Sequence, residues 1–187
     1  MAIHATLYDP AGNCPDVKTQ PDRVGLGGGC HWCTEAVFQA LRGVVDVAQG
    51  FVCAPPPHDS WSEAVIVSFD PELIDLRTLI EVHSRTHAST SHHKMRGKYR
   101  SAIYTFNAAQ AGLAIAVLGD LQSEFAKPLV TLVLDHADFK PSDERFHNYY
   151  ATDPERPFCR TYIDPKLQLI RQNYSEFAEP VVAGEGA

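Results

Sequence analysis

The residues best suited to chemistry are Cys30, which directly follows the consecutive glycines at positions 27–29, and Cys33, three residues later. A cysteine thiolate is a nucleophile, and a second thiol at this spacing can close a disulfide with it. The apolar residues after Cys30 recur at helical spacing and predict a helix over about residues 30–42. A thiol in its first turn would lie near the positive end of the helix dipole, where the thiolate is favoured. A buried, inert cysteine is the other interpretation, but the glycines and Trp32 favour a reactive thiol.

The carboxyl group of Glu63 is a candidate proton donor for the same site. Residues 62–69 alternate in polarity, which predicts a strand in which Glu63 shares a face with Val65, Val67 and Phe69. A carboxyl group among these apolar side chains would be desolvated, and desolvation favours the protonated form that general acid catalysis requires. A solvent-exposed glutamate at the fraying start of a strand is the other interpretation, and the alternation alone leaves both open.

A histidine-rich segment over residues 83–96 raises the question of a metal site. His83 and His87 are four residues apart and would share one helix face, with His92 or His93 as a third ligand. No acidic ligand and general base accompany them as in the zinc-protease motif, so we expect no metal site. A polar loop with unrelated histidines and a substrate-binding loop are the alternatives.

A known family signature resembles the stretch that contains both cysteines, which reads Gly29-Cys30-His31-Trp32-Cys33-Thr34-Glu35. The signature is Gly-Cys-Phe-Trp-Gly-x-Glu, and it belongs to the peptide methionine sulfoxide reductases of the A type, which reduce the S epimer of methionine sulfoxide. Further matches follow in the same order at residues 62–65, 69–71, 99–104 and 144–150, leading to Cys159. The resemblance covers about residues 22–160.

The resemblance implies an enzyme and a role for three residues. Cys30 would attack the sulfoxide sulfur while Glu63, assisted by the phenol of Tyr99, protonates the oxygen. Methionine would then leave, and Cys30 would become a sulfenic acid with which a second thiol condenses to give a disulfide. An external dithiol, most simply thioredoxin, would reduce that disulfide without any cofactor. The substrate would be methionine sulfoxide, either in proteins or free.

The resemblance also implies how the substrate is bound. Trp32 and Tyr149 would line the pocket for the substrate methyl group. Tyr149 belongs to residues 146–150, which we call the aromatic block. His31 stands where the family has phenylalanine, so it would make this pocket more polar, or would stabilise the Cys30 thiolate if charged. Lys94 stands where the family has an aspartate, which leaves the size of the substrate open.

Two cysteines are candidates for the second thiol. Cys159 follows the aromatic block, where the family often keeps its resolving cysteine on a mobile carboxy-terminal segment, and we expect it to resolve the sulfenic acid. Cys33 is the second candidate, because its spacing from Cys30 allows a disulfide at the helix start. Cys53 ranks third, and Cys14 has no predicted role.

Two other functions stay open from the residues themselves. A thiol–disulfide oxidoreductase would use the two active-site cysteines directly and would not need Glu63. A non-enzymatic redox or metal-binding module, built from Cys30, Cys33 and the histidines, would bind zinc and show no turnover.

Helices and strands are intermixed along the 187 residues, which predicts an α+β two-layer sandwich with a mixed sheet. The resemblance implies a ferredoxin-like core. We expect an irregular arm over residues 1–21, a single catalytic domain over 22–174 and a disordered tail over 175–187. Strands are predicted near residues 24–26, 44–53, 62–69, 101–106 and 129–134, and helices near 30–42, 73–83 and 108–122.

Composition limits the partners and the compartment. The net charge of −7 argues against nucleic acid, because phosphate binding needs clustered lysine and arginine. The odd count of 5 cysteines, without a predicted signal peptide, favours a reducing cytoplasm over a disulfide framework. No apolar run is long enough to predict a membrane span, and we expect a monomer.

Overall fold

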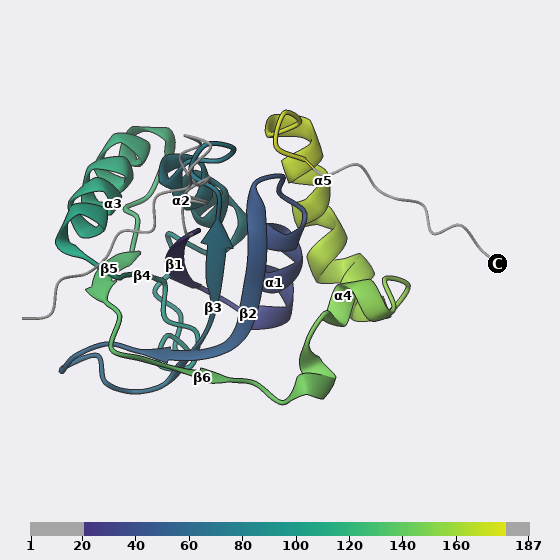
Figure 1. Ribbon diagram of the computed structural model, residues 1–187, viewed down its shortest axis with the longest axis horizontal. Helices are drawn as coiled ribbons and strands as arrows, with labels where there is room; N and C mark the ends of the chain where they lie inside the picture. The colour runs from purple at the N-terminus through teal and green to yellow at the C-terminus, as the bar shows by residue number, and fades with distance from the viewer. Residues whose placement is uncertain (1–20, 179–187) are drawn as a thin grey trace, which may run out of the picture.

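The computed structural model describes residues 21–178, which form an α+β fold around one mixed sheet (Figure 1). The strands are β1 (Asp22–Gly27), β2 (Val44–Cys53), β3 (Ser62–Phe69), β4 (Ala102–Thr105), β5 (Leu132–Asp135) and β6 (Asp138–Pro141). The α-helices are α1 (His31–Gln39), α2 (Leu76–Thr86), α3 (Ala108–Leu121), α4 (Tyr149–Thr152) and α5 (Asp164–Asn173), and a π-helical turn (Cys159–Ile163) leads into α5.

The strand order is β5-β4-β1-β3-β2-β6, and every neighbouring pair is antiparallel except β4 and β5. Helix α1 connects β1 to β2, and α2 lies between β3 and β4. In this register Gly27, the last residue of β1, pairs with Ala64, while Phe51 of β2 pairs with Glu63. The start of β3 therefore lies beside the loop that leads into α1.

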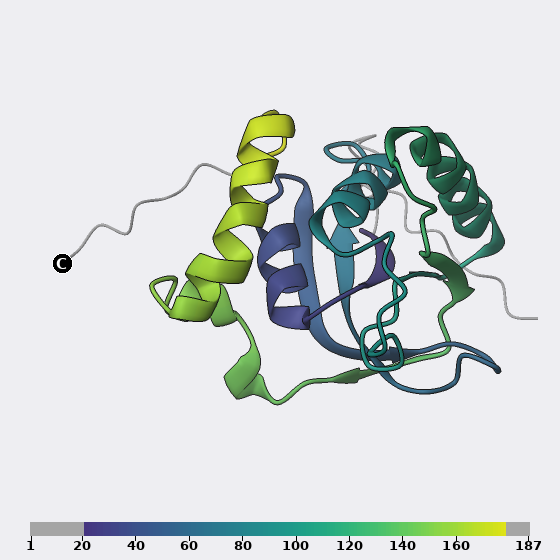
Figure 2. The ribbon, with the colours of Figure 1, turned by 180° about the vertical axis from the view of Figure 1, so that it is seen from behind.

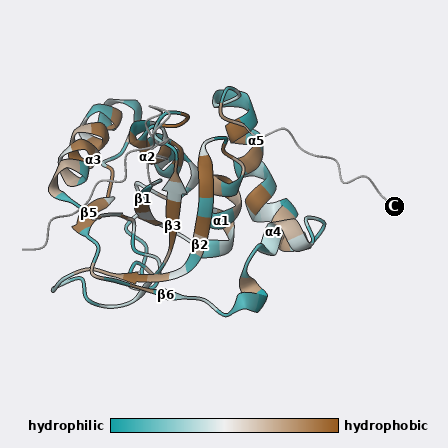
Figure 3. Ribbon diagram, in the orientation of Figure 1, coloured by the Kyte–Doolittle hydropathy of each residue, from teal (hydrophilic) through white to brown (hydrophobic). Residues whose placement is uncertain are grey.

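The main core lies between the sheet and the helices on one of its faces, which Figure 2 shows from the helix side. Alternate residues of β3 are buried on opposite faces: Val65 and Val67 join this core, whereas Ile66 joins a smaller cluster on the other face. Figure 3 shows β2 and β3 largely in the colour of apolar residues, and β3 is buried on both faces along nearly its whole length. The alternation predicted for residues 62–69 is therefore present.

The predicted bounds of β2 and β3 are confirmed, whereas the two helices that position the site are shifted. Helix α1 ends at Gln39 rather than near residue 42, and Gly43, with φ of +95°, turns the chain into β2. Helix α2 begins at Leu76 rather than near residue 73, because Asp75 caps it by accepting a hydrogen bond from the N–H of Thr78 at 2.7 Å.

The prediction for the carboxy-terminal third is wrong in two places. Strand β5 begins at Leu132 rather than near residue 129, because the N–H of Val130 donates to the carbonyl of Ser89 in a loop. Residues 175–178 were assigned to a disordered tail, but the N–H of Arg42 donates to the carbonyl of Phe177 at 2.6 Å. The segments 1–20, with Cys14, and 179–187 lie outside the described residues.

No helix within residues 21–178 is long and apolar enough to cross a membrane.

Candidate active site

Cys30 is the N-cap residue of α1, so its thiol lies at the positive end of the helix dipole. Its carbonyl accepts hydrogen bonds from the N–H groups of Cys33 and Thr34 at 3.1 and 3.2 Å, which begin the helix. The predicted position of Cys30 at the start of this helix is therefore confirmed. Cys30 lies one residue before the helix, however, rather than inside its first turn.

Two of the three glycines before Cys30, Gly27 and Gly28, are required by close packing. A Cβ atom on Gly28 would overlap the ring of His87, and one on Gly27 would lie 2.9 Å from the carbonyl oxygen of Arg100. Gly29 faces open space, where an added Cβ would have no neighbour within 4 Å, and it borders a cavity. None of the three has a positive φ, so a left-handed backbone conformation does not explain these glycines.

The thiol of Cys33 lies close enough to the sulfur of Cys30 to act as its hydrogen-bond donor. This hydrogen bond, together with the N–H groups of Trp32 and Cys33, lowers the pKa of Cys30 against the opposing effects of burial and the charge on Glu63. The same hydrogen bond, burial and the charge of Cys30 raise the pKa of Cys33. Cys30 is therefore the more acidic thiol of the pair, and Cys33 holds its proton more tightly.

Glu63 is buried at the start of β3, with 6% of its surface exposed, beside the N-terminus of α1. Its Oε2 accepts a hydrogen bond from the N–H of His31 at 3.2 Å. Its Oε1 lies 3.3 Å from the Nζ of Lys98, an exposed side chain that reaches over the carboxyl group from the following loop. Of the two interpretations of Glu63 from sequence, the structure agrees with the buried one, and these contacts compensate its burial.

Tyr99 lies at the end of a loop that Arg96 holds in place. The guanidinium group of Arg96 donates to the carbonyl oxygens of Ser91 at 2.9 Å, Tyr99 at 3.1 Å and Gly28 at 3.3 Å. The loop that carries Tyr99 is thereby tied to the glycine segment before Cys30. The side chain of Tyr99 borders both of the cavities that meet at Cys30.

The first cavity, which we call the aromatic cavity, has a volume of about 400 Å³ and contains the predicted catalytic residues in its wall. Its lining includes Cys30, Glu63 and Tyr99 together with the aromatic residues Trp32, Phe51, Phe146 and Phe158. A nucleophilic sulfur, a carboxyl group and a phenol thus face one largely apolar space. Such a space suits a small apolar group attached to a polar one.

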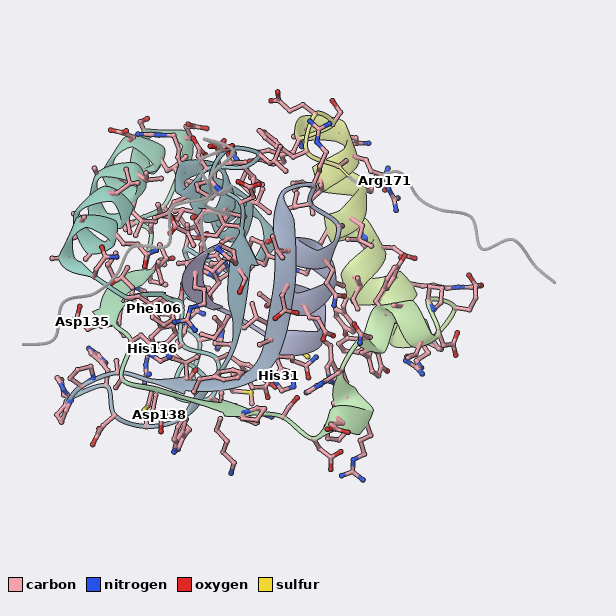
Figure 4. All side chains as sticks on the ribbon, in the orientation of Figure 1. His31, Phe106, Asp135, His136, Asp138 and Arg171 are labelled. Carbon is pink, nitrogen blue, oxygen red and sulfur yellow. The ribbon has the colours of Figure 1, made fainter. Side chains whose placement is uncertain are left out.

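His31 and Trp32 form part of this wall as predicted, but Tyr149 does not. The Trp32 ring stacks on the Tyr149 ring at 4.2 Å with an interplanar angle of 4°, so Tyr149 supports Trp32. The Nδ1 of His31 donates to the carbonyl oxygen of Gly50 at 3.1 Å, which fixes the imidazole edge-on to Phe51. Figure 4 shows His31 at the end of α1 nearest to the curved part of β2.

Glu35 is a buried residue that supports the site from behind, and no local pattern in the sequence predicts this position. Its buried carboxylate accepts hydrogen bonds from the side chain of Gln49 at 2.8 Å and from the N–H groups of Asn148 at 2.9 Å and Tyr149 at 3.3 Å. These bonds hold the aromatic block against α1 and so position Tyr149 behind Trp32. Glu35 is the last residue of the signature stretch, which was the only sign in the sequence of its importance. Its hydrogen-bond partners lie too far along the chain for a local pattern to predict them.

The second cavity, which we call the lysine cavity, has a volume of about 340 Å³ and lies on the other side of Cys30. Its lining includes Cys30, Cys33, Thr86, Tyr99, Phe158 and Lys166. No pattern in the sequence around Lys166 indicates that α5 brings this residue to the cysteines.

His83 of α2 and His87 at its C-cap each contact other protein groups through Nε2. The Nε2 of His83 donates to the carbonyl of Gly27 at 2.8 Å, and the Nε2 of His87 lies 2.7 Å from the hydroxyl of Ser101. Burial lowers the pKa of His83 to about 4 and also lowers that of His87, so both are neutral near pH 7. Across residues 21–178 no group of three histidine, cysteine, aspartate or glutamate side chains is arranged to hold a metal ion.

The remaining candidate cysteines lie outside both cavities. Cys159 is fully buried in the π-helical turn, where its thiol donates to the carbonyl of Asp153 at 3.6 Å and burial raises its pKa. Cys159 still faces Cys33, and a negative charge on Cys159 would raise the pKa of Cys33. Cys53 is the last residue of β2 and pairs with Asp138 of β6.

The chemistry open to this pair of sulfurs is redox chemistry, in which one sulfur accepts oxygen and the other reduces the product. That places the protein among the thiol-dependent reductases. Residues 22–178 match the family model described as peptide methionine sulfoxide reductase. Because this match spans most of the sequence, the chain belongs to the peptide methionine sulfoxide reductase family.

Curated relatives and solved structures agree with this assignment. A peptide methionine sulfoxide reductase MsrA of Thermus thermophilus is 33% identical over 169 residues, covering 83% of this chain and 96% of the relative. The crystal structure of Mxr1 from Saccharomyces cerevisiae in reduced form superimposes with a TM-score of 0.67 at 21% identity, covering 83% of this chain and 94% of that one. Mxr1 in complex with Trx2 gives 0.57 at 20% identity, covering 77% and 91%.

Proposed function

We propose that this protein reduces the S epimer of methionine sulfoxide to methionine, with Cys30 as the nucleophile. The observation that carries the proposal is the Cys30 thiol at the N-cap of α1, with a lowered pKa, in the wall of the same cavity as Glu63 and Tyr99. Membership of the peptide methionine sulfoxide reductase family supports the same reaction.

In the proposed reaction the Cys30 sulfur attacks the sulfoxide sulfur. A proton from Glu63, with Tyr99 as the second donor, converts the sulfoxide oxygen into a better leaving group. The oxygen ends on Cys30 as a sulfenic acid, so the substrate sulfur is reduced by two electrons and the Cys30 sulfur is oxidised by two. The contact between Glu63 and Lys98 at 3.3 Å then gives the carboxylate left by proton transfer a counter-charge.

The aromatic cavity is the proposed site for the methylsulfinyl group. Trp32 and Phe51 give the apolar surface that a methyl group requires, and the stack of Trp32 on Tyr149 keeps that surface rigid. His31 contributes a polar edge where the family has phenylalanine. The cavity is open to methionine sulfoxide in proteins and to the free amino acid.

The geometry favours Cys33 over Cys159 for the resolving step. Cys33 is already hydrogen-bonded to Cys30, whereas Cys159 is buried outside both cavities. A disulfide made in this way needs an external dithiol, and we propose a thioredoxin-like protein in that role. The solved complex of yeast Mxr1 with Trx2 supports this choice of partner.

We further propose that residues 22–174 act as one catalytic domain with a ferredoxin-like core, as a monomer in the cytoplasm. The central order β4-β1-β3-β2, with α1 after β1 and α2 after β3, supports this core. The catalytic thiol needs a reducing compartment, which supports the location. Size-exclusion chromatography with light scattering tests the monomer, since a mass of twice the 20.6 kDa chain would contradict it.

Turnover of the separate S and R epimers, free and in a peptide, with dithiothreitol as reductant, tests the proposed reaction. We expect turnover of the S epimer only, abolished in Cys30→Ser and strongly reduced in Glu63→Gln. Cys53→Ser and Glu72→Gln are the matched controls, because Cys53 lies outside both cavities and Glu72 is exposed on the surface.

A thiol–disulfide oxidoreductase is the second candidate, favoured by the hydrogen bond between Cys33 and Cys30. It predicts that insulin disulfides are reduced at a rate unaffected by Glu63→Gln, without turnover of either epimer. That result would replace the proposed function.

A further inference from the structure

Lys166 is a partly buried cation for which the proposed reductase chemistry has no role. It lies in the first turn of α5 and lines the lysine cavity together with Cys30 and Cys33. Its Nζ donates a hydrogen bond to the carbonyl oxygen of Thr86, the last residue of α2. This bond fixes the ammonium group between α5 and α2, at the wall of the cavity into which the two sulfurs open.

The charge of Lys166 acts on Cys33. The hydrogen bond to Cys30 and burial raise the pKa of Cys33, and Lys166 opposes both effects. Burial lowers the pKa of Lys166 itself, while the charges of Cys33 and Cys30 raise it, so ionisation of either sulfur favours the ammonium form. The cation and the Cys33 sulfur thus stabilise each other's charged forms.

Among residues 21–178 no aspartate or glutamate lines this cavity, and its other titratable residues are His83, His87, His93, Tyr99 and Tyr162. His83 of α2 and His87, which directly follows this helix, are neutral because burial lowers the pKa of each. Cys159 faces Cys33 from the π-helical turn as a thiol, because burial raises its pKa. Arg96 acts on the two histidines from the loop before Tyr99 and adds positive charge on that side.

We propose that Lys166 is a positioning residue for the resolving step, in which its ammonium group favours the ionised form of Cys33 for attack on Cys30. The inference rests on the proposed reductase function. Once Cys30 is a sulfenic acid it has lost its negative charge, so it no longer holds the proton of Cys33. Only burial then opposes ionisation of Cys33, and the cation is in place to offset it.

The step balances without a further reagent. The Cys33 thiol loses its proton, and its sulfur attacks the sulfur of the Cys30 sulfenic acid. The S–S bond forms as the S–O bond breaks, and hydroxide leaves and takes up a proton to give water. The Cys33 sulfur is oxidised and the Cys30 sulfur is reduced, each by one electron, and the sulfoxide was the oxidant.

A single turnover without reductant separates the two steps. The enzyme is mixed with an excess of an S-methionine sulfoxide peptide. Methionine peptide is quantified for the first step, and dimedone-trapped sulfenic acid and mass-mapped disulfide for the second. We expect Lys166→Met to form methionine at the wild-type rate but to close the Cys30–Cys33 disulfide about tenfold more slowly at pH 7, with the pH midpoint raised by about one unit.

Two variants make the result specific to charge. Lys166→Arg should resolve at close to the wild-type rate, and Lys127→Met, which removes an exposed lysine, should change nothing. A disulfide that forms equally fast in Lys166→Met would overturn the inference, as would equal slowing at every pH or a disulfide between Cys30 and Cys159. If the wild-type protein forms no methionine, the proposed function itself fails, which the first readout identifies separately.

Discussion

Replacing Cys33 by alanine should raise the pKa of Cys30, because it removes the hydrogen bond that lowers that pKa most. A hydrogen bond to a charged group contributes about 1.5–3 kcal/mol. One pKa unit corresponds to about 1.4 kcal/mol, so the full effect would be about one to two units. Since Cys30 is partly exposed, solvent screens the interaction and we expect about one unit.

The assay is the rate at which iodoacetamide alkylates Cys30 as a function of pH, with the modified peptide quantified by mass spectrometry. Cys33→Ser is the matched variant, because its hydroxyl can still donate to the Cys30 sulfur while it removes the second thiol equally well. The midpoint should rise in Cys33→Ala and stay near the wild-type value in Cys33→Ser. Equal midpoints for wild type and Cys33→Ala, or equal rises in both variants, would refute this account of the acidity of Cys30.

Three further predictions concern the parts of the fold that support the site. Glu35→Gln should lower the free energy of unfolding by about 2 kcal/mol, because one backbone N–H loses its acceptor; urea unfolding measures this, and wild-type stability would contradict it. Gly50→Ala should cost about 1–3 kcal/mol, because its Cβ would overlap the carbonyl of Lys140, whereas Gly112→Ala, in open space, should not destabilise the protein. The native pKa of His83, about 4, lies below its ordinary 6.5, so the native state binds fewer protons than the unfolded state and stability falls as the pH drops from 6.5 toward 4. Urea unfolding across this range should show that up to about 3 kcal/mol of the loss disappears in His83→Gln. The same pH dependence in the variant as in the wild type would contradict this prediction.

Local sequence patterns were sufficient to predict the strands that need only an apolar layer, and no particular residue, to pack against. The alternation over residues 62–69 and the apolar run over 44–53 predicted β3 and β2 at their observed bounds, because a strand buried against any apolar layer needs that pattern. Helix ends were less predictable. Asp75 starts α2 through a specific hydrogen bond, and the apolar residues before it had suggested an earlier start.

The chemistry of Cys30 was available from sequence because its causes are local. The glycines, the helix start and Cys33 all lie within a few residues of it, and the structure places the thiol at the N-cap with Cys33 as its hydrogen-bond donor. The burial of Glu63 was left open by its position at a strand end. The N–H of His31 and the ammonium of Lys98, which compensate that burial, come from other segments.

Sequence alone therefore determined the reactive thiol, the central strands and the residue types of the site. Only the tertiary structure decided that Glu35 holds the aromatic block, that Tyr149 supports Trp32 from behind, and that Lys166 reaches the cavity beside Cys33. These contacts join residues far apart in the chain: the first two depend on how α1 packs against α4, and the third on how α5 packs beside α2. A carboxylate or ammonium group carries no mark of its partner in the sequence, because burial and geometry select that partner only after the chain has folded.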